Sequence, residues 1–398
     1  MFSQKISHLK DKFRFLFYFL QYAAAELAAL LIRGREKYKN LWIISERGTD
    51  ARDNGYHLFR YIRQNHPEIN IRYIISRDSP DYEKAASLGE TIPYRSFRHM
   101  LAFVLSSVKI STHIMGYAAD MYFFKLLDIK RPVSGIKVFL QHGITMHNPD
   151  YLKAETTNLD LFVCTARREY EFVNANFGYA DGVVQKLGMC RYDRLSSEGN
   201  RTKSRVILFM PTWRVYLGGV SEKVFKKSNY YRAFQSMLSD SRIRGLLDKY
   251  GYSIEFYPHP EIERRIGYFY VPEEIKLLDA GSTDIQKKMI QADILITDFS
   301  SVAFDFAYMK KPVIYYQPDR EEFYHGHFQK GYFSYEEDGF GPAVGSLEEL
   351  AAYLEKCMEQ NGEMESCYRK RVENFFEYQD QNNCERNFQA ILKLAKGK

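Results

Sequence analysis

Short apolar runs recur along the chain and are separated by longer stretches with helical periodicity. The runs are rich in β-branched and aromatic residues, and they are apolar at consecutive positions instead of alternating with polar ones. Strands buried on both faces of a parallel sheet have this pattern, and the stretches between them are then crossover helices. The predicted strands are 41–45, 71–76, 108–112, 137–141 and 161–165 in the first half and 205–210, 252–257, 275–279, 293–297 and 312–317 in the second.

The strand pattern occurs twice, with a polar break at 196–204 between the two sets. A chain of 398 residues also has too many residues for a single hydrophobic core of ordinary size. We therefore predict an α/β fold with two Rossmann-like, doubly wound domains facing a cleft. The expected ranges are 1–40 for an N-terminal helix, 41–197 for the first domain and 198–398 for the second, whose helical tail is expected to cross back to the first.

The N-terminal segment 13–32 is an apolar run flanked by cations on both sides, with Glu26 inside it. Its length matches the roughly 20 residues that a membrane span needs. A carboxylate in lipid is costly, however, and flanking cations suit anionic headgroups. We predict a helix that lies in the membrane interface; the alternative is a helix that packs on the first domain.

Composition narrows the classes of function. Hydrophobic residues make up 45% and charged residues 27%, which is typical of a globular protein. The net charge of +6 fits a phosphate-rich partner or an anionic membrane surface. The Lys and Arg residues are scattered along the chain, however, and do not predict nucleic-acid binding. The five cysteines contain no C-x-x-C pair, which argues against a disulfide framework or a zinc module and for a reducing compartment. No metal or cofactor is predicted.

Ligands of doubly wound sheets bind beyond the carboxyl ends of the strands, so polar residues there are the candidates for chemistry. Gln141-His142-Gly143 ends the strand 137–141. A neutral imidazole accepts a proton from a hydroxyl near neutral pH, and Gly143 permits close backbone approach. His142 is either a catalytic base or a histidine that is satisfied at a strand end.

Two further strands are followed by similar candidates. Pro211-Thr212-Trp213-Arg214 follows the strand 205–210, where an arginine fork suits phosphate oxygens. Tyr257-Pro258-His259-Pro260 follows 252–257, and its prolines restrict the direction of His259, which suits donation to a pyrophosphate. The structural alternatives are a surface arginine and a turn histidine.

The segment 293–310 gives the strongest signal. A buried strand leads to Asp298, then to Ser300 and Ser301, and then to an amphipathic helix. Free N–H groups and hydroxyls at a helix start form an anion site, and we predict a pyrophosphate there; plain helix capping by serine is the alternative. The pair His325 and His327 lacks further ligands at suitable spacing and is interpreted as a loop.

With these residues in hand, the chain resembles the CDP-glycerol glycerophosphotransferase family, which includes teichoic acid primases and polymerases. The resemblance covers about 41 to 380. It is carried by Gln141-His142-Gly143, Pro211-Thr212-Trp213-Arg214, His259-Pro260 and Thr297-Asp298-Phe299-Ser300-Ser301 running on to Asp305-Phe306-Ala307.

The resemblance implies a GT-B-like arrangement, association with the cytoplasmic side of the membrane, and CDP-glycerol as the donor, with CMP released. It implies a lipid-linked glycan or teichoic-acid-type acceptor. His142 would be the general base, and His259, Arg214, Ser300 and Ser301 would hold the donor phosphates, with Gly143, Thr212 and Asp298 at the same site.

The chain departs from the family pattern in places. Gln141 stands where family members often carry Trp, and Cys190 replaces a proline in the block 188–193. The polyol and the acceptor therefore stay open. The alternatives are a CDP-ribitol transferase, a CMP-sugar transferase of the polysialyltransferase kind, and a membrane-bound nucleotide-binding scaffold without catalysis.

Overall fold

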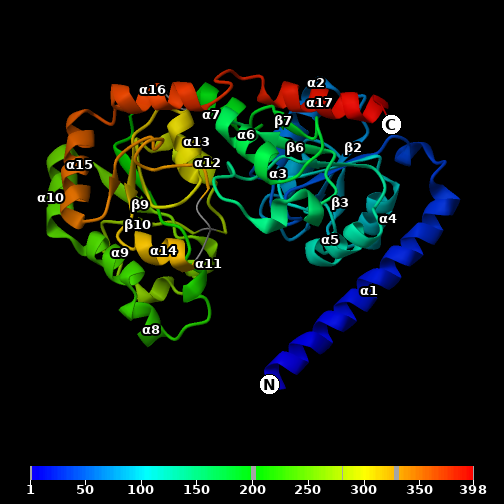
Figure 1. The fold of residues 1–398 in the computed structure, drawn as a ribbon, viewed down its shortest axis with the longest axis horizontal. Coiled ribbons are helices and arrows are strands. Elements are labelled where there is room, and N and C mark those ends of the chain that lie inside the picture. Colours follow the sequence, from blue (N-terminus) through cyan, green and yellow to red (C-terminus); the bar gives the residue numbers. More distant parts are fainter. Residues whose placement is uncertain (1, 199–202, 280, 327–330, 398) are drawn as a thin grey trace. The chain divides into compact units, whose positions relative to one another are not determined.

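The computed structural model describes residues 2–198, 203–279, 281–326 and 331–397. They form two compact units, and Figure 1 traces the chain through both. Unit 1 comprises Met1–His142, Asp150–Asp193 and Asn382–Lys398, and unit 2 comprises Gly143–Pro149 and Arg194–Gln381. Compared with the predicted ranges, the short segment after His142 lies with unit 2 and the C-terminal segment lies with unit 1. Within the predicted break, 199–202 lie outside the described residues.

Unit 1 contains a parallel sheet with the strand order β3-β2-β1-β4-β5-β6-β7. Its strands are β1 (Trp42–Ser45), β2 (Ile71–Ile75), β3 (Thr91–Pro93), β4 (Val108–Ser111), β5 (Ile136–Phe139), β6 (Leu161–Cys164) and β7 (Val184–Lys186). The strand order reverses between β1 and β4, which is the place where Rossmann-type sheets bind ligands. Its helices are α1 (Phe2–Ile32), α2 (Asn54–Asn65), α3 (Tyr82–Ala86), α4 (Phe97–Leu105), α5 (Met121–Lys130), α6 (Arg167–Asn176) and α17 (Asn383–Gly397), and α7 (Tyr192–Glu198) crosses into unit 2.

Both faces of this sheet are covered, which explains the uninterrupted apolar runs. Ile44 of β1 packs with Phe59 of α2 and Ile391 of α17 on one face. Its neighbour Ile43 packs with Phe103 of α4 and Phe124 of α5 on the other. Successive side chains of a strand point to opposite faces, so a strand covered on both sides is apolar at every position.

Helix α1 docks on unit 1 through one side. Tyr18, Tyr22, Ala25 and Ala29 are buried, and α1 packs along α4. Glu26, the acidic residue of the apolar run, is 3.0 Å from the Nη2 of Arg131. By length and composition, Lys12–Ile32 is able to cross a membrane, although only 22% of its most apolar stretch is buried within the protein.

The C-terminal helix α17 returns to unit 1, as predicted for the tail. Its first turn receives Asp193, whose carboxylate accepts hydrogen bonds from the amides of Asn383 (2.8 Å) and Cys384 (2.9 Å). Further along, Phe388 stacks on His66 with ring centroids 3.9 Å apart. These contacts anchor the first half of α17 to unit 1.

Unit 2 repeats the arrangement, with the strand order β10-β9-β8-β11-β12-β13 and every pair parallel. Its strands are β8 (Val206–Met210), β9 (Ser253–Phe256), β10 (Lys276–Leu277), β11 (Ile294–Thr297), β12 (Val313–Tyr316) and β13 (Ala343–Val344). Its helices are α8 (Glu222–Lys227), α9 (Asn229–Ser239), α10 (Ser241–Tyr250), α11 (Pro260–Glu263), α12 (Ile285–Gln291), α13 (Val302–Tyr308), α14 (Arg320–Gly326), α15 (Leu347–Glu359) and α16 (Ser366–Phe375). The order reverses between β8 and β11.

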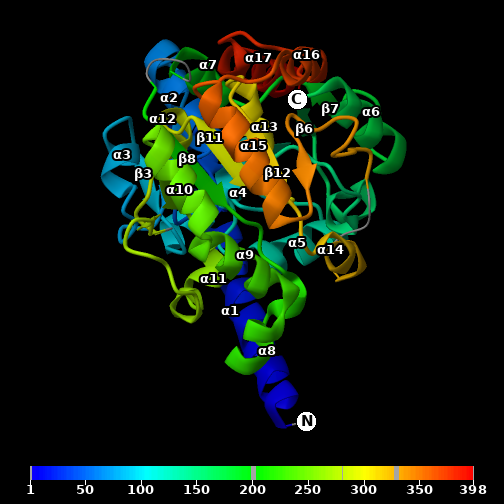
Figure 2. The same cartoon turned by 90° about the vertical axis from the view of Figure 1, so that its left-hand side faces the viewer.

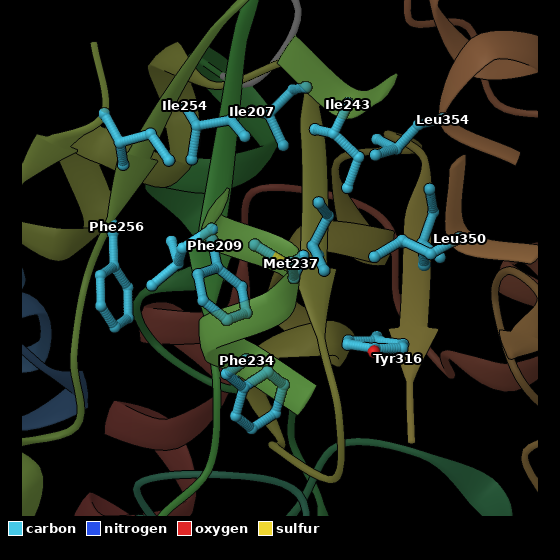
Figure 3. Packing of buried hydrophobic residues seen from close by; sticks show 14 of the residues in the cluster. Ile207, Phe209, Phe234, Met237, Ile243, Ile254, Phe256, Tyr316, Leu350 and Leu354 are labelled. Atoms are coloured by element: carbon cyan, nitrogen blue, oxygen red, sulfur yellow. The ribbon is translucent and has the colours of Figure 1, made fainter. Parts of the chain in front are cut away.

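Helices α9, α10 and α15 cover one face of this second sheet (Figure 2). Figure 3 shows the buried side chains between these helices and the sheet. Phe209 and Phe256 stack on neighbouring strands, and Phe234 of α9 packs against Phe209 and Tyr316. This apolar layer packs α9 against β8 and β12.

The predicted fold class is confirmed, since both sheets are parallel, flanked by helices and wound in the Rossmann order. Each of the ten predicted strands is present. The prediction missed β3, β7 and β13, which lie at sheet edges and span only two or three residues.

Candidate active site

The two strongest motifs of the second half meet where the strand order of unit 2 reverses. The backbone N–H of Thr212, after β8, donates to Asp298 Oδ1 at 2.8 Å, and the N–H of Phe299 donates to the same oxygen at 2.7 Å. The hydroxyl of Thr297 donates to the carbonyl of Met210 at 2.7 Å. These bonds join the ends of β8 and β11 into one rigid edge.

Arg214 lies fully buried beneath this edge. Its Nε and Nη2 donate to the two carboxylate oxygens of Asp319 at 2.7 and 2.8 Å, and Nη2 also lies 2.8 Å from Asp298 Oδ2. Its Nη1 donates to the carbonyl of Thr212 at 2.9 Å. Burial alone would lower the pKa of Arg214, but the two carboxylates raise it, so the guanidinium stays charged.

The sequence suggested that Arg214 binds a phosphate or lies at the surface, whereas these contacts place it inside unit 2. Its guanidinium binds groups of unit 2 and has 0% exposure, so it has no solvent-accessible surface to offer to a phosphate in this conformation. The rings of Tyr230, Phe299 and Phe323 lie about its guanidinium at 4.9–5.0 Å. Asp298 is likewise fully buried. Direct contact of Arg214 or Asp298 with a donor stays a prediction, whereas their part in the framework is observed.

Ser300 and Ser301 follow this edge and are half-buried. Ser300 Oγ accepts the N–H of Val302 at 3.3 Å, and Ser301 is the N-cap of α13. Gly143, which belongs to unit 2, lies directly against Ser301: a Cβ on Gly143 would be 2.5 Å from Ser301 Oγ. Only glycine fits this approach without displacing the serine hydroxyl.

His259 follows β9 and caps the short helix α11. Its Nδ1 accepts the backbone N–H of Glu261 at 3.2 Å. An acceptor at Nδ1 places the proton of the neutral ring on Nε2. The half-buried imidazole is therefore a hydrogen-bond donor at Nε2, which is the atom suited to an anionic oxygen.

His142 follows β5 in unit 1. Its Nδ1 lies 3.3 Å from the carbonyl oxygen of Thr112, and only a protonated Nδ1 forms that bond. The neutral ring then carries its lone pair on Nε2. The side chain is exposed, yet desolvation by the surrounding protein still lowers its pKa, an effect that the nearby carboxylate of Asp53 partly opposes. The ring is thus held in the form that accepts a proton.

Gln141 sets the direction in which the chain leaves β5. It adopts a left-handed backbone conformation, with φ of 60°, and is buried. Its Nε2 donates to the carbonyl of Val163 (2.6 Å) and to Glu169 Oε1 (2.9 Å), and its own carbonyl accepts from Asn54 Nδ2 at 2.8 Å. These bonds hold a strained residue immediately before His142.

Sequence reasoning missed a histidine beside His142. His113, after β4, stacks on His142 with ring centroids 4.4 Å apart. The buried Glu46, after β1, accepts backbone N–H groups from its own loop, including that of Asp53 at 2.7 Å. Asp53 in turn lies 2.6 Å from Arg191 Nη1. The signal was available for His113, because it follows a predicted strand as His142 does.

The structure thus groups Thr212, Arg214 and Asp298 at one edge of unit 2 and sets Ser301 against Gly143. His142 lies in unit 1, and a meeting of His142 with the unit 2 group across a cleft stays a prediction. His325 lies in the helix α14, so the loop predicted for it was wrong, and His327 lies outside the described residues.

Comparison with known proteins identifies the family to which this site belongs. Residues 27–393 match the family described as CDP-glycerol:poly(glycerophosphate) glycerophosphotransferase. The chain is 36% identical over 372 residues to the minor teichoic acid biosynthesis protein GgaB of Bacillus subtilis (strain 168), covering 90% of this chain and 40% of GgaB. It is 23% identical over 368 residues to a teichoic acid poly(glycerol phosphate) polymerase of Staphylococcus epidermidis, covering 86% of this chain and 48% of the polymerase.

The chain therefore spans less than half the length of these two relatives. Among solved structures, the wall teichoic acid polymerase TagF superposes with a TM-score of 0.69 at 18% identity, covering 98% of each chain, which shows a shared fold. Because the family match runs through both units and includes every site motif, the chain belongs to the CDP-glycerol:poly(glycerophosphate) glycerophosphotransferase family, a family of transferases.

Proposed function

We propose that this chain transfers glycerol phosphate from CDP-glycerol to a hydroxyl of a membrane-linked glycan or teichoic-acid-type acceptor. The acceptor oxygen attacks the β-phosphorus, the bond from that phosphorus to the bridging oxygen breaks, and CMP leaves with the electron pair. The acceptor proton passes to a base on the protein. The observation that carries the proposal is the family match over residues 27–393, which includes the ends of β5, β8, β9 and β11.

His142 is the proposed base. The Thr112 carbonyl holds its Nδ1–H, so the Nε2 lone pair is available for the acceptor proton. The lowered pKa keeps the ring neutral at cellular pH, which is the state that a base needs before each turnover. A purely nucleotide-binding scaffold has no use for an exposed imidazole in this tautomer.

Unit 2 is the proposed donor side. The Nε2–H of His259 and the hydroxyls of Ser300 and Ser301 are the groups suited to the donor phosphates, and they stabilise the charge that develops on the transferred group. Arg214 acts from beneath this surface by holding Asp298, whose carboxylate binds the amides of the two motif loops. Positioning supplies much of the acceleration in such a reaction.

Helix α1 is the proposed membrane contact. Its outer face carries exposed apolar side chains, and α5 beside it continues the same surface, since the rings of Phe15 and Tyr122 lie 5.8 Å apart. The exposed large apolar side chains of these two helices are Phe13, Leu16, Phe17, Phe19, Leu20, Leu27, Leu30 and Leu31 of α1 and Met121, Tyr122, Leu126 and Ile129 of α5. A helix lying in the interface of the cytoplasmic leaflet would keep unit 1 beside a lipid-linked acceptor.

The test is CMP release by the purified protein with CDP-glycerol, CDP-ribitol or a CMP-sugar as donor and a lipid-linked disaccharide as acceptor. We expect release with CDP-glycerol that depends on the acceptor. Release only with CDP-ribitol or a CMP-sugar would replace the proposed donor. Binding of CDP-glycerol without release of CMP for any acceptor would favour the scaffold.

A further inference from the structure

His113 and His142 lie ring against ring in unit 1. Their ring centroids are 4.4 Å apart and their planes differ by 6°. The strands β4 and β5 are parallel neighbours that pair at Ser111 and Phe139, so both histidines leave the sheet at the same edge. The proposed mechanism uses His142 alone and gives His113 no part.

Thr112 holds both rings at once. Its carbonyl accepts the Nδ1–H of His142 at 3.3 Å, and its hydroxyl lies 3.0 Å from Nδ1 of His113. The backbone N–H of His113 donates to Ser111 Oγ (3.1 Å), which itself donates to the carbonyl of Glu46 at 3.0 Å. His113 is therefore tied through its own backbone to the end of β1 and is a fixed surface for its neighbour.

The surroundings favour neutral rings. Burial lowers the pKa of His113 well below its usual range, and His142 and Arg47 lower it further. Desolvation lowers the pKa of His142; the carboxylate of Asp53 opposes this effect, and the guanidinium groups of Arg191 and Arg47 add to it. Two stacked imidazoles do not readily carry charge together, because like charges at this separation repel. The stack thus agrees with a neutral His142.

We propose that His113 is a positioning residue whose ring is the platform on which His142 lies, so that His142 keeps its Nδ1–H on the Thr112 carbonyl and its lone pair on Nε2. The proposal rests on the proposed function, since it assigns the Nε2 of His142 the acceptor proton. His113 acts through His142 and touches no reacting atom. Without the platform, the His142 ring is free to turn about its outer side-chain bond and lose that tautomer.

Kinetics of three variants test the platform. We expect H113A to lower kcat about 10- to 100-fold while the donor KM stays within about twofold, because the base is misplaced and the donor side is unchanged. H113F keeps an aromatic face without ring nitrogens and should retain kcat within about threefold, whereas H113L fills the space without an aromatic face and should resemble H113A. H66A is the matched control, because it removes another stacked histidine of unit 1 and should leave kcat unchanged.

Imidazole nitrogen NMR of His142 gives a readout that needs no turnover. In the wild-type protein we expect a single Nδ1–H tautomer with a lowered pKa. In H113A and H113L we expect a mixture of tautomers and a pKa closer to 6.5, with H113F and H66A like the wild type. Fluorescence of Trp42, recorded with Trp213 replaced by Phe, checks that unit 1 is folded in each variant.

The outcomes separate this proposal from the function on which it rests. The proposal for His113 is wrong if H113A retains the wild-type kcat. It is also wrong if the His142 tautomer is unchanged in H113A and H113L. An H113F enzyme as impaired as H113A also contradicts it, because a ring nitrogen would then be required. If the wild-type protein releases no CMP from any donor, or if H142A turns over normally, the proposed function fails while the NMR comparison still decides whether His113 orients His142.

Discussion

Asp319 holds both Nε and Nη2 of Arg214 in the core of unit 2, at 2.7 and 2.8 Å, although the two residues are 105 positions apart in the chain. Arg214 also reaches Asp298 and the carbonyl of Thr212, so a single guanidinium links both motif loops to the start of α14. The proposed donor surface therefore rests on a buried ionic group that does not itself reach that surface.

Asp319→Asn should destabilise unit 2 strongly. The substitution removes one carboxylate from a buried cation, and breaking such a group typically costs about 3–5 kcal/mol. Urea unfolding followed by Trp213 fluorescence in a Trp42→Phe background measures the effect on unit 2. The exposed pair Lys249–Glu355 provides the control, since Glu355→Gln should leave the unfolding midpoint unchanged. Equal urea midpoints for Asp319→Asn and the wild type would show that the Arg214–Asp319 pair does not stabilise unit 2.

His142→Ala should abolish catalysis and spare folding. Loss of a general base typically lowers the rate about 10²- to 10⁴-fold, and the exposed side chain contributes little packing. CMP release measures the rate, and the unchanged signal of Trp42 reports the fold of unit 1. Turnover near the wild-type level would show that another group accepts the proton.

Gly143→Ala should weaken donor binding with little effect on stability. The new Cβ would lie 2.5 Å from Ser301 Oγ, so that hydroxyl must rotate away. We expect a donor KM that rises several-fold, because the free energy of one hydrogen bond, about 1 kcal/mol, is lost. In a Ser301→Ala background the same substitution should add almost nothing to KM. Additive effects in that double-mutant cycle would mean that the two positions act independently.

Acid should destabilise unit 1 through His99. This buried ring donates from Nε2 to the Tyr117 carbonyl (2.8 Å) and accepts the Arg95 N–H at Nδ1 (3.1 Å), so it has no room for a second proton. Burial lowers its pKa from 6.5 to about 4. The unfolded chain then binds more protons than the folded one below pH 6.5, and stability falls as the pH falls from 6.5 towards 4.

The measurement for His99 compares urea unfolding at pH 7.0 and 5.5. Wild-type protein should lose about 1 kcal/mol more than His99→Gln over this interval, because a shift of one pKa unit corresponds to about 1.4 kcal/mol. Trp42 fluorescence in a Trp213→Phe background reports on unit 1. The same loss in both proteins would assign the acid sensitivity to other groups.

The outer face of α1 should be required for membrane binding. Replacing Phe17, Leu20 and Leu27 with Gln removes exposed apolar side chains and should abolish co-sedimentation with phosphatidylglycerol vesicles without unfolding unit 1. The control replaces Val224 and Tyr270, which are exposed apolar residues of unit 2, and should bind as the wild type does. Undiminished binding by the α1 variant would place the membrane contact elsewhere.

The site shows where sequence reasoning reached its limit. The placement of His142 after β5 followed from local pattern, but its tautomer is set by the Thr112 carbonyl at the end of the neighbouring strand β4. Arg214 looked like a phosphate ligand because it follows a strand. Its partner Asp319 follows β12, and nothing in the spacing of the two residues indicates that they meet.

The sequence by itself determined the two parallel sheets, the N-terminal helix and the strand ends at which the candidate residues stand. Hydrophobic periodicity is local, so a strand covered on both faces is visible in a few consecutive residues. Only the tertiary structure decided which strand ends are neighbours, and hence that His113 stacks on His142 and that Asp319 pairs with Arg214. Such pairings depend on the order of strands across a sheet, and free energy gained between residues far apart in the chain leaves no periodic trace in the chain itself.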